Sequence, residues 1–153
     1  MRVILDETEY LGIWDKVYAE YRFDRAAAEW LRLPLPHKKY RITQYWTAEQ
    51  EQIVNGIFSR LCPEKMYALD WQHDCFRFSP TENIPPDYSY HDAERDVNVY
   101  FPRYYPDGDF HFFLSEDWQY GLFGHPWRDE IYVMGDALIA EFEKMRTQLQ
   151  IES

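Results

Sequence analysis

Between Met66 and Met134 the chain carries one strand-like segment after another, with no helical pattern among them. Side chains alternate with period 2 from Met66 to Trp71 and again from His73 to Phe78. Later segments that suit strands cover 97–101, 110–114, 119–123 and 130–134. Strands that follow one another without a crossover helix pair in antiparallel fashion. The succession therefore argues against parallel βαβ winding and predicts an antiparallel sheet.

Amphipathic helices are predicted on both sides of this region of the chain. An apolar stripe predicts a helix over 8–21. A capping box of Thr47 and Gln50 begins a second helix, which ends near Cys62, and a third apolar stripe covers 138–149. We predict an α+β fold in which helices near the N-terminus, middle and C-terminus pack on one face of five to six antiparallel strands. Residues 1–153 are expected to form a single domain.

Turn and loop signals refine this outline. The Asp107-Gly108 pair tolerates positive φ and predicts a hairpin between the strands 97–101 and 110–114. Two prolines in the segment 33–37 lead into a short edge strand over 38–43. The stretch 79–96 is rich in prolines and acids, lacks a sustained period and is predicted to be a long surface loop.

The chain is strongly acidic, with a formal net charge of −11 from 16 Lys and Arg against 27 Asp and Glu. Such a field repels phosphate backbones and anionic membranes, so neither nucleic acid nor a membrane is expected as a partner. It favours a basic protein or another cationic ligand, although solubility alone also explains an acidic composition. No signal-peptide pattern and no run long enough for a membrane helix is found, which indicates a cytoplasmic protein. Cys62 and Cys75 are expected to be buried thiols.

Carboxylates and tyrosines concentrate between Thr81 and Trp118. This segment holds nine acids against two bases, Arg95 and Arg103. Tyrosine and tryptophan anchor protein interfaces and carboxylates steer a cationic partner, so the segment is a candidate binding surface. The alternative is a solvated loop whose tyrosines cover the sheet. The tyrosines concerned are Tyr88, Tyr90, Tyr100, Tyr104 and Tyr105.

Histidine and cysteine side chains could meet on neighbouring strands. His73 and Cys75 face the same way if both lie on one strand, and His111 lies on another, so a metal cluster is conceivable. The CxxC and HxxxH spacings of structural zinc sites do not occur, and hydrogen-bonded histidines at a sheet surface are a simpler explanation. We therefore assign no metal ligand.

Acidic pairs lie on both sides of the predicted strand 110–114. Asp107 and Asp109 precede it, and Glu116 and Asp117 follow it. Together they could supply carboxylates for acid–base chemistry or for a hard cation. Turn formation explains them more simply, because aspartate side chains satisfy local backbone amides.

The sequence contains no motif of covalent or nucleotide-dependent catalysis. It has no GxSxG elbow and no glycine-rich phosphate loop, and neither cysteine is expected to lie in a basic or glycine-rich pocket. Enzymatic activity is uncertain and less expected than binding, and no cofactor is expected.

The loop Phe123-Gly124-His125-Pro126-Trp127 presents a histidine between two large aromatic residues. Glycine and proline fix its backbone, and the corner can be purely structural if His125 is hydrogen-bonded to the main chain. Alternatively, His125, His73 or His111 acts as an acid–base group beside a pocket lined by Trp71, Trp118 and Trp127.

Four blocks of the chain form a recognisable set: Ile13-Trp14-Asp15-Lys16-Val17-Tyr18, Tyr67-Ala68-Leu69-Asp70-Trp71-Gln72-His73-Asp74-Cys75-Phe76-Arg77-Phe78, Tyr105-Pro106-Asp107-Gly108-Asp109-Phe110-His111-Phe112-Phe113-Leu114 and Gly121-Leu122-Phe123-Gly124-His125-Pro126-Trp127. Together they resemble a bacterial family of small single-domain proteins of unknown function. The resemblance covers most of the chain in order, apart from 79–96. It implies a bacterial cytosolic domain and transfers no activity, cofactor or catalytic residue.

Two classes of function follow. The first is a non-enzymatic acidic binding protein with a basic protein partner, for which the immunity proteins that neutralise cationic toxin nucleases are a model. The second is a small-molecule-binding protein or hydrolase with an aromatic pocket and a histidine acid–base group. The sequence leaves the oligomeric state open. The candidate binding residues are Trp71, His73, Tyr104, Tyr105, Asp107, Asp109, His111, Trp118, His125 and Trp127.

Overall fold

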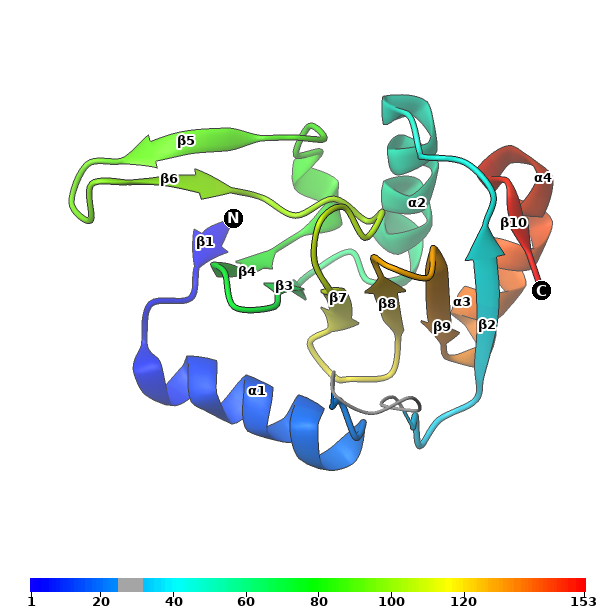
Figure 1. The fold of residues 1–153 in the computed structure, drawn as a ribbon, viewed down its shortest axis with the longest axis horizontal. Coiled ribbons are helices and arrows are strands. Elements are labelled where there is room, and N and C mark those ends of the chain that lie inside the picture. Colours follow the sequence, from blue (N-terminus) through cyan, green and yellow to red (C-terminus); the bar gives the residue numbers. More distant parts are fainter. Residues whose placement is uncertain (25–31) are drawn as a thin grey trace.

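An eight-stranded antiparallel sheet forms the centre of the protein (Figure 1). The computed structural model describes residues 1–24 and 32–153. The strand order is β1-β4-β3-β7-β8-β9-β2-β10, so β7 and β8 lie in the interior and two-residue strands lie at the edges. The strands are β1 (Arg2–Val3), β2 (His37–Ile42), β3 (Met66–Asp70), β4 (Cys75–Phe78), β7 (His111–Ser115), β8 (Gly121–His125), β9 (Glu130–Met134) and β10 (Ile151–Glu152).

Helices cover both faces of this sheet. α1 (Glu7–Glu20) packs on one face, whereas α2 (Ala48–Leu61), α3 (Asp136–Lys144) and α4 (Arg146–Leu149) pack on the other (Figure 1). The α+β class with an antiparallel sheet is confirmed. The expected five to six strands and the expected single covered face are both wrong.

Burial of the central strands explains the second helical layer. Every residue of β7 and of β8 is buried. Phe112 and Leu114 belong to the core cluster under α1, and Phe113, between them, belongs to the cluster under α2. This is the alternation that a strand imposes. Because both faces of these strands are apolar, each face needs its own covering layer.

Local capping signals place the first two helices correctly. Asp6 caps α1 by accepting the backbone N–H three residues further on. Thr47 and Gln50 form the predicted capping box at the start of α2. The helix predicted over 138–149 is two helices, α3 and α4, which meet at Met145.

The hairpin predicted between 97–101 and 110–114 is wrong. β6 (Val97–Tyr100) pairs with β5 (Ser89–Asp92) in a separate two-stranded sheet, the β5–β6 hairpin, whereas β7 pairs with β3 and β8. An Asp-Gly turn signal is local and does not specify which strand becomes the partner. The hairpin extends beyond the large sheet (Figure 1).

Two further predictions about this outline need correction. The stretch 79–96 contains a short 3-10 helix, η1 (Pro80–Glu82), as well as β5, and so is not simply a loop. The strand predicted over 38–43 is present as β2, but it lies between β9 and β10 and is therefore not an edge strand.

Candidate functional site

A cleft of about 890 Å³ opens between the β5–β6 hairpin, the start of α1, the β3–β4 turn and the loop that precedes β7. We call it the acidic cleft, because five carboxylates and one arginine line it. Exposed apolar side chains of Leu5, Val97 and Tyr100 line it as well. The five carboxylates are those of Glu7, Asp70, Asp74, Asp107 and Asp109.

The arginine of the acidic cleft is held by two acids. Arg95 donates to both carboxylate oxygens of Asp74, at 2.9 and 3.2 Å, and through Nε to Asp92 at 2.8 Å. The guanidinium also keeps the pKa of Asp92 below its usual range. These bonds tie the hairpin to the β3–β4 turn and offset the positive charge of Arg95, so the cleft as a whole remains negative.

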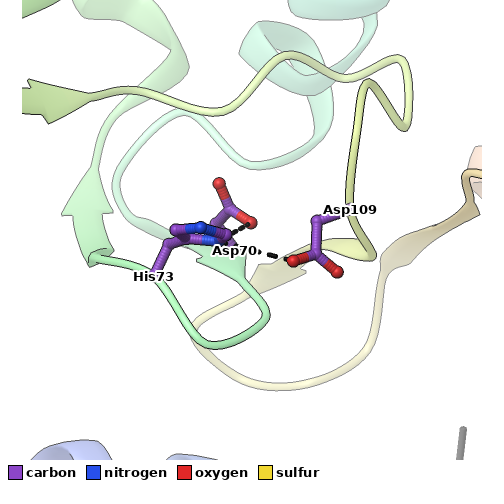
Figure 2. Close-up of side chains that lie close together, drawn as sticks. All are labelled: Asp70, His73 and Asp109. Carbon is purple, nitrogen blue, oxygen red and sulfur yellow. Dashed lines mark hydrogen bonds and ion pairs between the residues drawn. The ribbon is translucent and has the colours of Figure 1, made fainter.

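Side chains of Asp70, His73 and Asp109 converge in the acidic cleft (Figure 2). Nδ1 of His73 lies 3.1 Å from Oδ1 of Asp70 and 3.5 Å from Oδ2 of Asp109. Pairing of β3 with β7 explains the convergence, because it sets Asp70 opposite His111, two residues after Asp109. The tight turn after Asp70, in which the N–H of His73 donates to its carbonyl, brings in the imidazole.

His111 lies behind this cluster and has a defined tautomer. Its side chain is 4% exposed, and its Nδ1 lies 2.8 Å from the carbonyl of Arg103 and 3.0 Å from that of Tyr105. Carbonyl oxygens only accept, so Nδ1 carries the proton. Nε2 faces Oδ2 of Asp70 at 3.8 Å. Burial raises the pKa of Asp70, and the two nearby imidazoles oppose that rise.

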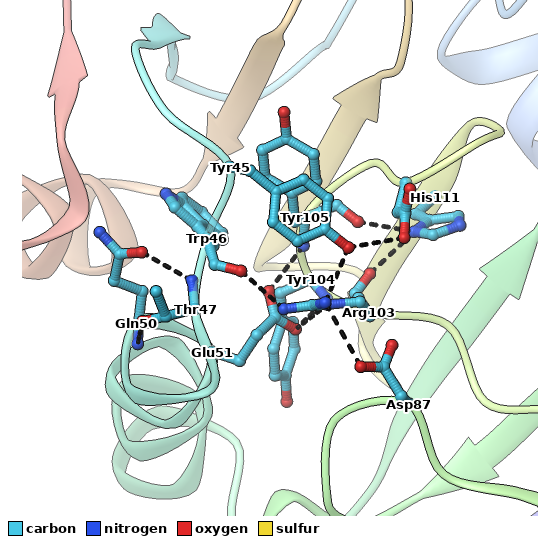
Figure 3. A network of polar contacts seen from close by, with 11 residues as sticks. Tyr45, Trp46, Thr47, Gln50, Glu51, Asp87, Arg103, Tyr104, Tyr105 and His111 are labelled. Atoms are coloured by element: carbon cyan, nitrogen blue, oxygen red, sulfur yellow. Dashed lines mark hydrogen bonds and ion pairs between the residues drawn. The ribbon is translucent and has the colours of Figure 1, made fainter.

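A buried polar network holds the segment that supplies these carbonyls (Figure 3). Glu51 of α2 is 3% exposed and accepts the backbone N–H groups of Tyr104 and Tyr105, at 2.8 and 3.0 Å. Burial raises the pKa of Glu51 to about 7, against the opposing effects of these two N–H groups and of Arg103. The carboxylate therefore clamps the main chain that enters β7 to the helix on the α2 face.

Arg103 completes the network on the other side of the segment. Its guanidinium donates to the carbonyl of Trp46 and to the hydroxyl of Tyr45, both at 2.7 Å, and lies over the Tyr45 ring. Its Nε is 3.9 Å from Glu51. A planar guanidinium suits this combination of stacking and directed donors. The network supports the main chain through these hydrogen bonds, but Nε of Arg103 is buried and has no hydrogen-bond partner among the described residues.

Gly124 of β8 positions the loop that bears Asp107 and Asp109. A Cβ atom at Gly124 would lie 2.5 Å from Cβ of Pro106, closer than side-chain atoms can approach. The missing side chain lets Pro106 pack directly on the sheet. The loop thereby has a fixed anchor next to the acidic cleft.

Of the predicted binding residues, His73, Asp107 and Asp109 line the acidic cleft, with His111 behind them. The carboxylate of Asp107 also accepts the hydroxyl of Tyr45 at 2.7 Å. Tyr104 and Tyr105 instead have buried rings, 7% and 9% exposed. Their role is packing and main-chain support for the site.

The three predicted pocket tryptophans do not enclose one cavity. Trp118 packs on Tyr21 and Tyr67, whereas Trp71 and Trp127 each make a T-shaped contact with Phe110. None of the five cavities described for residues 1–24 and 32–153 has a tryptophan in its lining.

His125 is 6% exposed and accepts the backbone N–H of Trp127 through Nδ1 at 3.3 Å. Burial lowers its pKa. Its ring packs against Phe110, with the ring centroids 5.0 Å apart. These contacts match the structural alternative, in which the histidine is bonded to the main chain at the corner.

The conceivable meeting of His73, Cys75 and His111, which the sequence allowed but did not predict, occurs only in part. The two histidines lie on either side of Asp70, but the Cys75 thiol packs in the core under α1. Burial raises its pKa to about 12, which disfavours the thiolate that binds metals. Both cysteines are free and buried, as predicted. Glu116 and Asp117 follow β7 at its other end and do not join the cluster.

Sequence reasoning missed Asp70, Glu51 and Arg103. A signal for Glu51 was present, because it stands three and seven residues before Val54 and Phe58, on the buried stripe of α2. A charged residue on an apolar stripe indicates a buried polar contact. No comparable signal existed for Asp70, because its role depends on the pairing of β3 with β7.

Comparisons with known proteins give a family without a known activity. The chain is 43% identical over 74 residues to an uncharacterised protein of Bacillus subtilis (strain 168), YxiI. That match covers 48% of the chain and 41% of the relative, so the chain spans less than half the length of that relative. No solved structure matches. Among the described residues, no helix is both long and apolar enough to cross a membrane. The family model for a protein of unknown function (DUF2716) matches residues 4–139, and the chain therefore belongs to that family.

Proposed function

We propose that this protein is a non-enzymatic binding protein that holds a cationic segment of a basic protein partner in the acidic cleft. The observation that carries the proposal is the composition of that cleft. Five carboxylates line it against one arginine, Arg95, which is paired with one of the five, Asp74, and with Asp92. Lysine and arginine side chains are the protein groups that such a lining attracts.

Apolar groups beside the carboxylates support a protein partner over a free cation. Leu5 and Tyr100 are both 62% exposed and Val97 is 41% exposed, and all three line the cleft. Protein interfaces combine aromatic and aliphatic contacts with a charged surround in this way. The net charge of −11 adds long-range steering of a basic partner. Immunity proteins that neutralise cationic toxin domains are a class of inhibitor with this chemistry.

The test uses a fluorescein-labelled peptide of alternating arginine and serine residues, with binding followed by fluorescence anisotropy. We expect binding that weakens steeply as salt is added, because screening weakens exposed charge pairs. The variant E7Q/D107N removes two carboxylates of the acidic cleft that are exposed. We expect it to weaken peptide affinity by about tenfold at low salt.

The matched control is E49Q/E64Q, which removes two exposed carboxylates outside the cleft and leaves the same net charge. Like the test pair, it combines an acid in the first turn of a helix with an acid in a loop. It should retain the affinity of the unmodified chain. Equal weakening in both variants would show that total charge, not the cleft, attracts the peptide. Salt-insensitive binding, or no binding, would refute the proposal.

A further inference from the structure

A cavity of about 380 Å³ lies between α2, the loop after η1 and the segment 101–104. We call it the arginine cavity, because Arg103 lines it. None of the described residues lines both this cavity and the acidic cleft. Small-molecule sites are usually cavities of about 300 to 1,000 Å³ with apolar walls and a few fixed polar groups. The volume of the arginine cavity falls in this range.

The walls of the arginine cavity are mostly apolar. Phe78 and Phe101 pack edge to face, with their ring centroids 5.1 Å apart. Proline and aromatic rings have few rotatable bonds, so ordering them around a ligand costs little entropy. These walls therefore suit a flat apolar body. The apolar lining residues are Phe78, Ile84, Pro85, Pro86, Phe101 and Pro102.

Arg103 brings an unpaired donor to this cavity. Its side chain is 9% exposed, and its Nε is buried without a hydrogen-bond partner among the described residues. The other two nitrogens of the guanidinium donate to Tyr45, Trp46 and Asp87 (Figure 3). A buried N–H group without an acceptor is costly to the folded state. An oxygen atom of a bound molecule would remove that cost.

Glu51 places an acceptor beside this donor. Its Oε1 lies 3.9 Å from Nε of Arg103, which is too far for a hydrogen bond. Each oxygen of Glu51 accepts one backbone N–H, from Tyr104 or Tyr105, and has a lone pair for a second donor. The cavity thus has a donor and an acceptor side by side that do not bond to each other. A carboxamide, with its neighbouring carbonyl and N–H, can bond to both.

The charges around Arg103 favour an uncharged ligand. Glu51 at 3.9 Å and Asp87 at 3.4 Å both offset the guanidinium. An anion would add a third negative charge beside one cation, and a cation would be repelled by Arg103. Burial of an unpaired charge is far more costly than burial of a hydrogen-bonded amide. An amide is therefore preferred over a carboxylate or an amine of the same shape.

We propose that the arginine cavity binds a small uncharged molecule that carries a planar apolar ring and a carboxamide or lactam group. The carbonyl oxygen accepts from the guanidinium of Arg103, the amide N–H donates to Glu51, and the ring lies against Phe101 and the prolines. This site is separate from the proposed partner site. The peptide experiment changes Glu7 and Asp107, which do not line the arginine cavity. Failure of one proposal can therefore be distinguished from failure of the other.

The experiment compares benzamide, benzoate and benzamidine, which have the same shape and different charges. Binding to the isotope-labelled chain is followed through amide chemical shifts at about pH 8, above the pKa of Glu51 of about 7, so that its carboxylate is ionised. We expect saturable binding of benzamide, with shifts concentrated in α2 and 101–104. Benzoate and benzamidine should bind about tenfold more weakly. Equal binding of either charged molecule, or no saturable binding of benzamide, would overturn the proposal.

The variant I84W fills the cavity from its apolar wall and leaves the polar network unchanged. The matched control is I139W, because Ile139 is also a partly buried isoleucine packed against the same core cluster but does not line the cavity. We expect I84W to weaken benzamide binding by about tenfold or more and I139W to leave it unchanged. Full retention of binding in I84W, or equal loss in both variants, would refute the assignment of the cavity.

A second variant tests the donor. R103K keeps the positive charge and removes the Nε–H group, so it should weaken benzamide binding by about tenfold. The control is R60K, which changes an exposed arginine paired with Glu141 and should bind benzamide as the unmodified chain does. Circular dichroism checks that R103K is folded, and I84W tests the cavity without altering Arg103. Unchanged affinity in folded R103K would contradict the role of the guanidinium.

Discussion

Oε1 of Glu51 accepts the main-chain N–H of Tyr104 at 2.8 Å. A side chain of α2 therefore holds the segment that leads into β7 and bears part of the candidate site. E51A removes this acceptor and the one that serves Tyr105 and leaves two buried N–H groups unpaired. We expect a loss of about 2 to 4 kcal/mol in the free energy of unfolding, measured by urea denaturation. Q52A, at the exposed neighbouring position of the same helix, should stay within about 0.5 kcal/mol of the unmodified chain.

Glu51 should also make stability depend on pH. Burial raises its pKa to about 7 from the ordinary value of 4.5, so the folded chain binds this proton more tightly than the unfolded chain does. The resulting stabilisation is fully present below the unfolded pKa and is lost as pH rises through about 7, by up to about 3 kcal/mol. In E51Q this contribution is absent. As pH rises from about 5 to about 8, the urea midpoint should therefore decrease less in E51Q than in the unmodified chain. An unchanged slope would contradict the assignment.

The contact between Gly124 and Pro106 predicts a strong effect of a single methyl group. In G124A the new Cβ would meet Pro106 at 2.5 Å, so either the loop or β8 must move. We expect a loss of about 1 to 3 kcal/mol in unfolding free energy and amide shifts in the loop of Asp107 and Asp109. The control is G56A in α2, where the added Cβ would meet its nearest neighbour, Arg60, at an ordinary 3.7 Å. It should stabilise the chain by about 0.5 to 1 kcal/mol.

Release of Arg95 should loosen the β5–β6 hairpin without unfolding the protein. R95A removes the donors to Asp74 and Asp92. Surface ion pairs contribute about 0 to 1 kcal/mol, so Tm should change little. Hydrogen exchange of amides in β5 and β6 should nevertheless accelerate, while exchange in β7 and β8 stays unchanged. R60A, which breaks the exposed pair between Arg60 and Glu141, should leave the hairpin amides unaffected.

The thiols should be unreactive in the folded protein. Burial raises the pKa values of Cys62 and Cys75 to about 12, and both side chains lie in the core. We expect Ellman's reagent to label both residues only at the rate of unfolding, and at once in urea. Rapid labelling of either residue in buffer would show that the core opens locally.

Features that depend on neighbouring residues in the sequence were predictable. The predicted helix 8–21 corresponds to α1, Glu7–Glu20, and the capping box at Thr47 is present. Both rest on contacts within one or two helical turns, and such contacts are specified by the local sequence.

Features that depend on the choice of partner strand were not predictable from local signals. The Asp107-Gly108 signal was paired with the wrong strand, because β6 found its partner in β5 and β7 in β3. Edge strands of two residues are too short to show a period. The second helical layer left a usable signal, since the run of buried side chains in β7 has no polar face to expose.

The same limit applies to the site. Sequence reasoning placed His73 and His111 on two strands, but His73 lies in the turn between β3 and β4. The structure brings the two histidines to opposite sides of one carboxylate. That carboxylate, Asp70, becomes important only through the register of β3 with β7. The backbone N–H groups of Tyr104 and Tyr105 are likewise held by Glu51, a residue far from them in the chain.

The separate ladder of the β5–β6 hairpin has an evolutionary consequence. Its hydrogen bonds are made within the hairpin, and residues such as Tyr100 and Val97 face outward beside the acidic cleft. Substitutions there can alter what the cleft recognises while the eight-stranded sheet keeps its pairing. Selection for a new partner can therefore act on the β5–β6 hairpin with little loss of stability in the eight-stranded sheet. We expect members of the family to diverge fastest in the hairpin and slowest in β7 and β8.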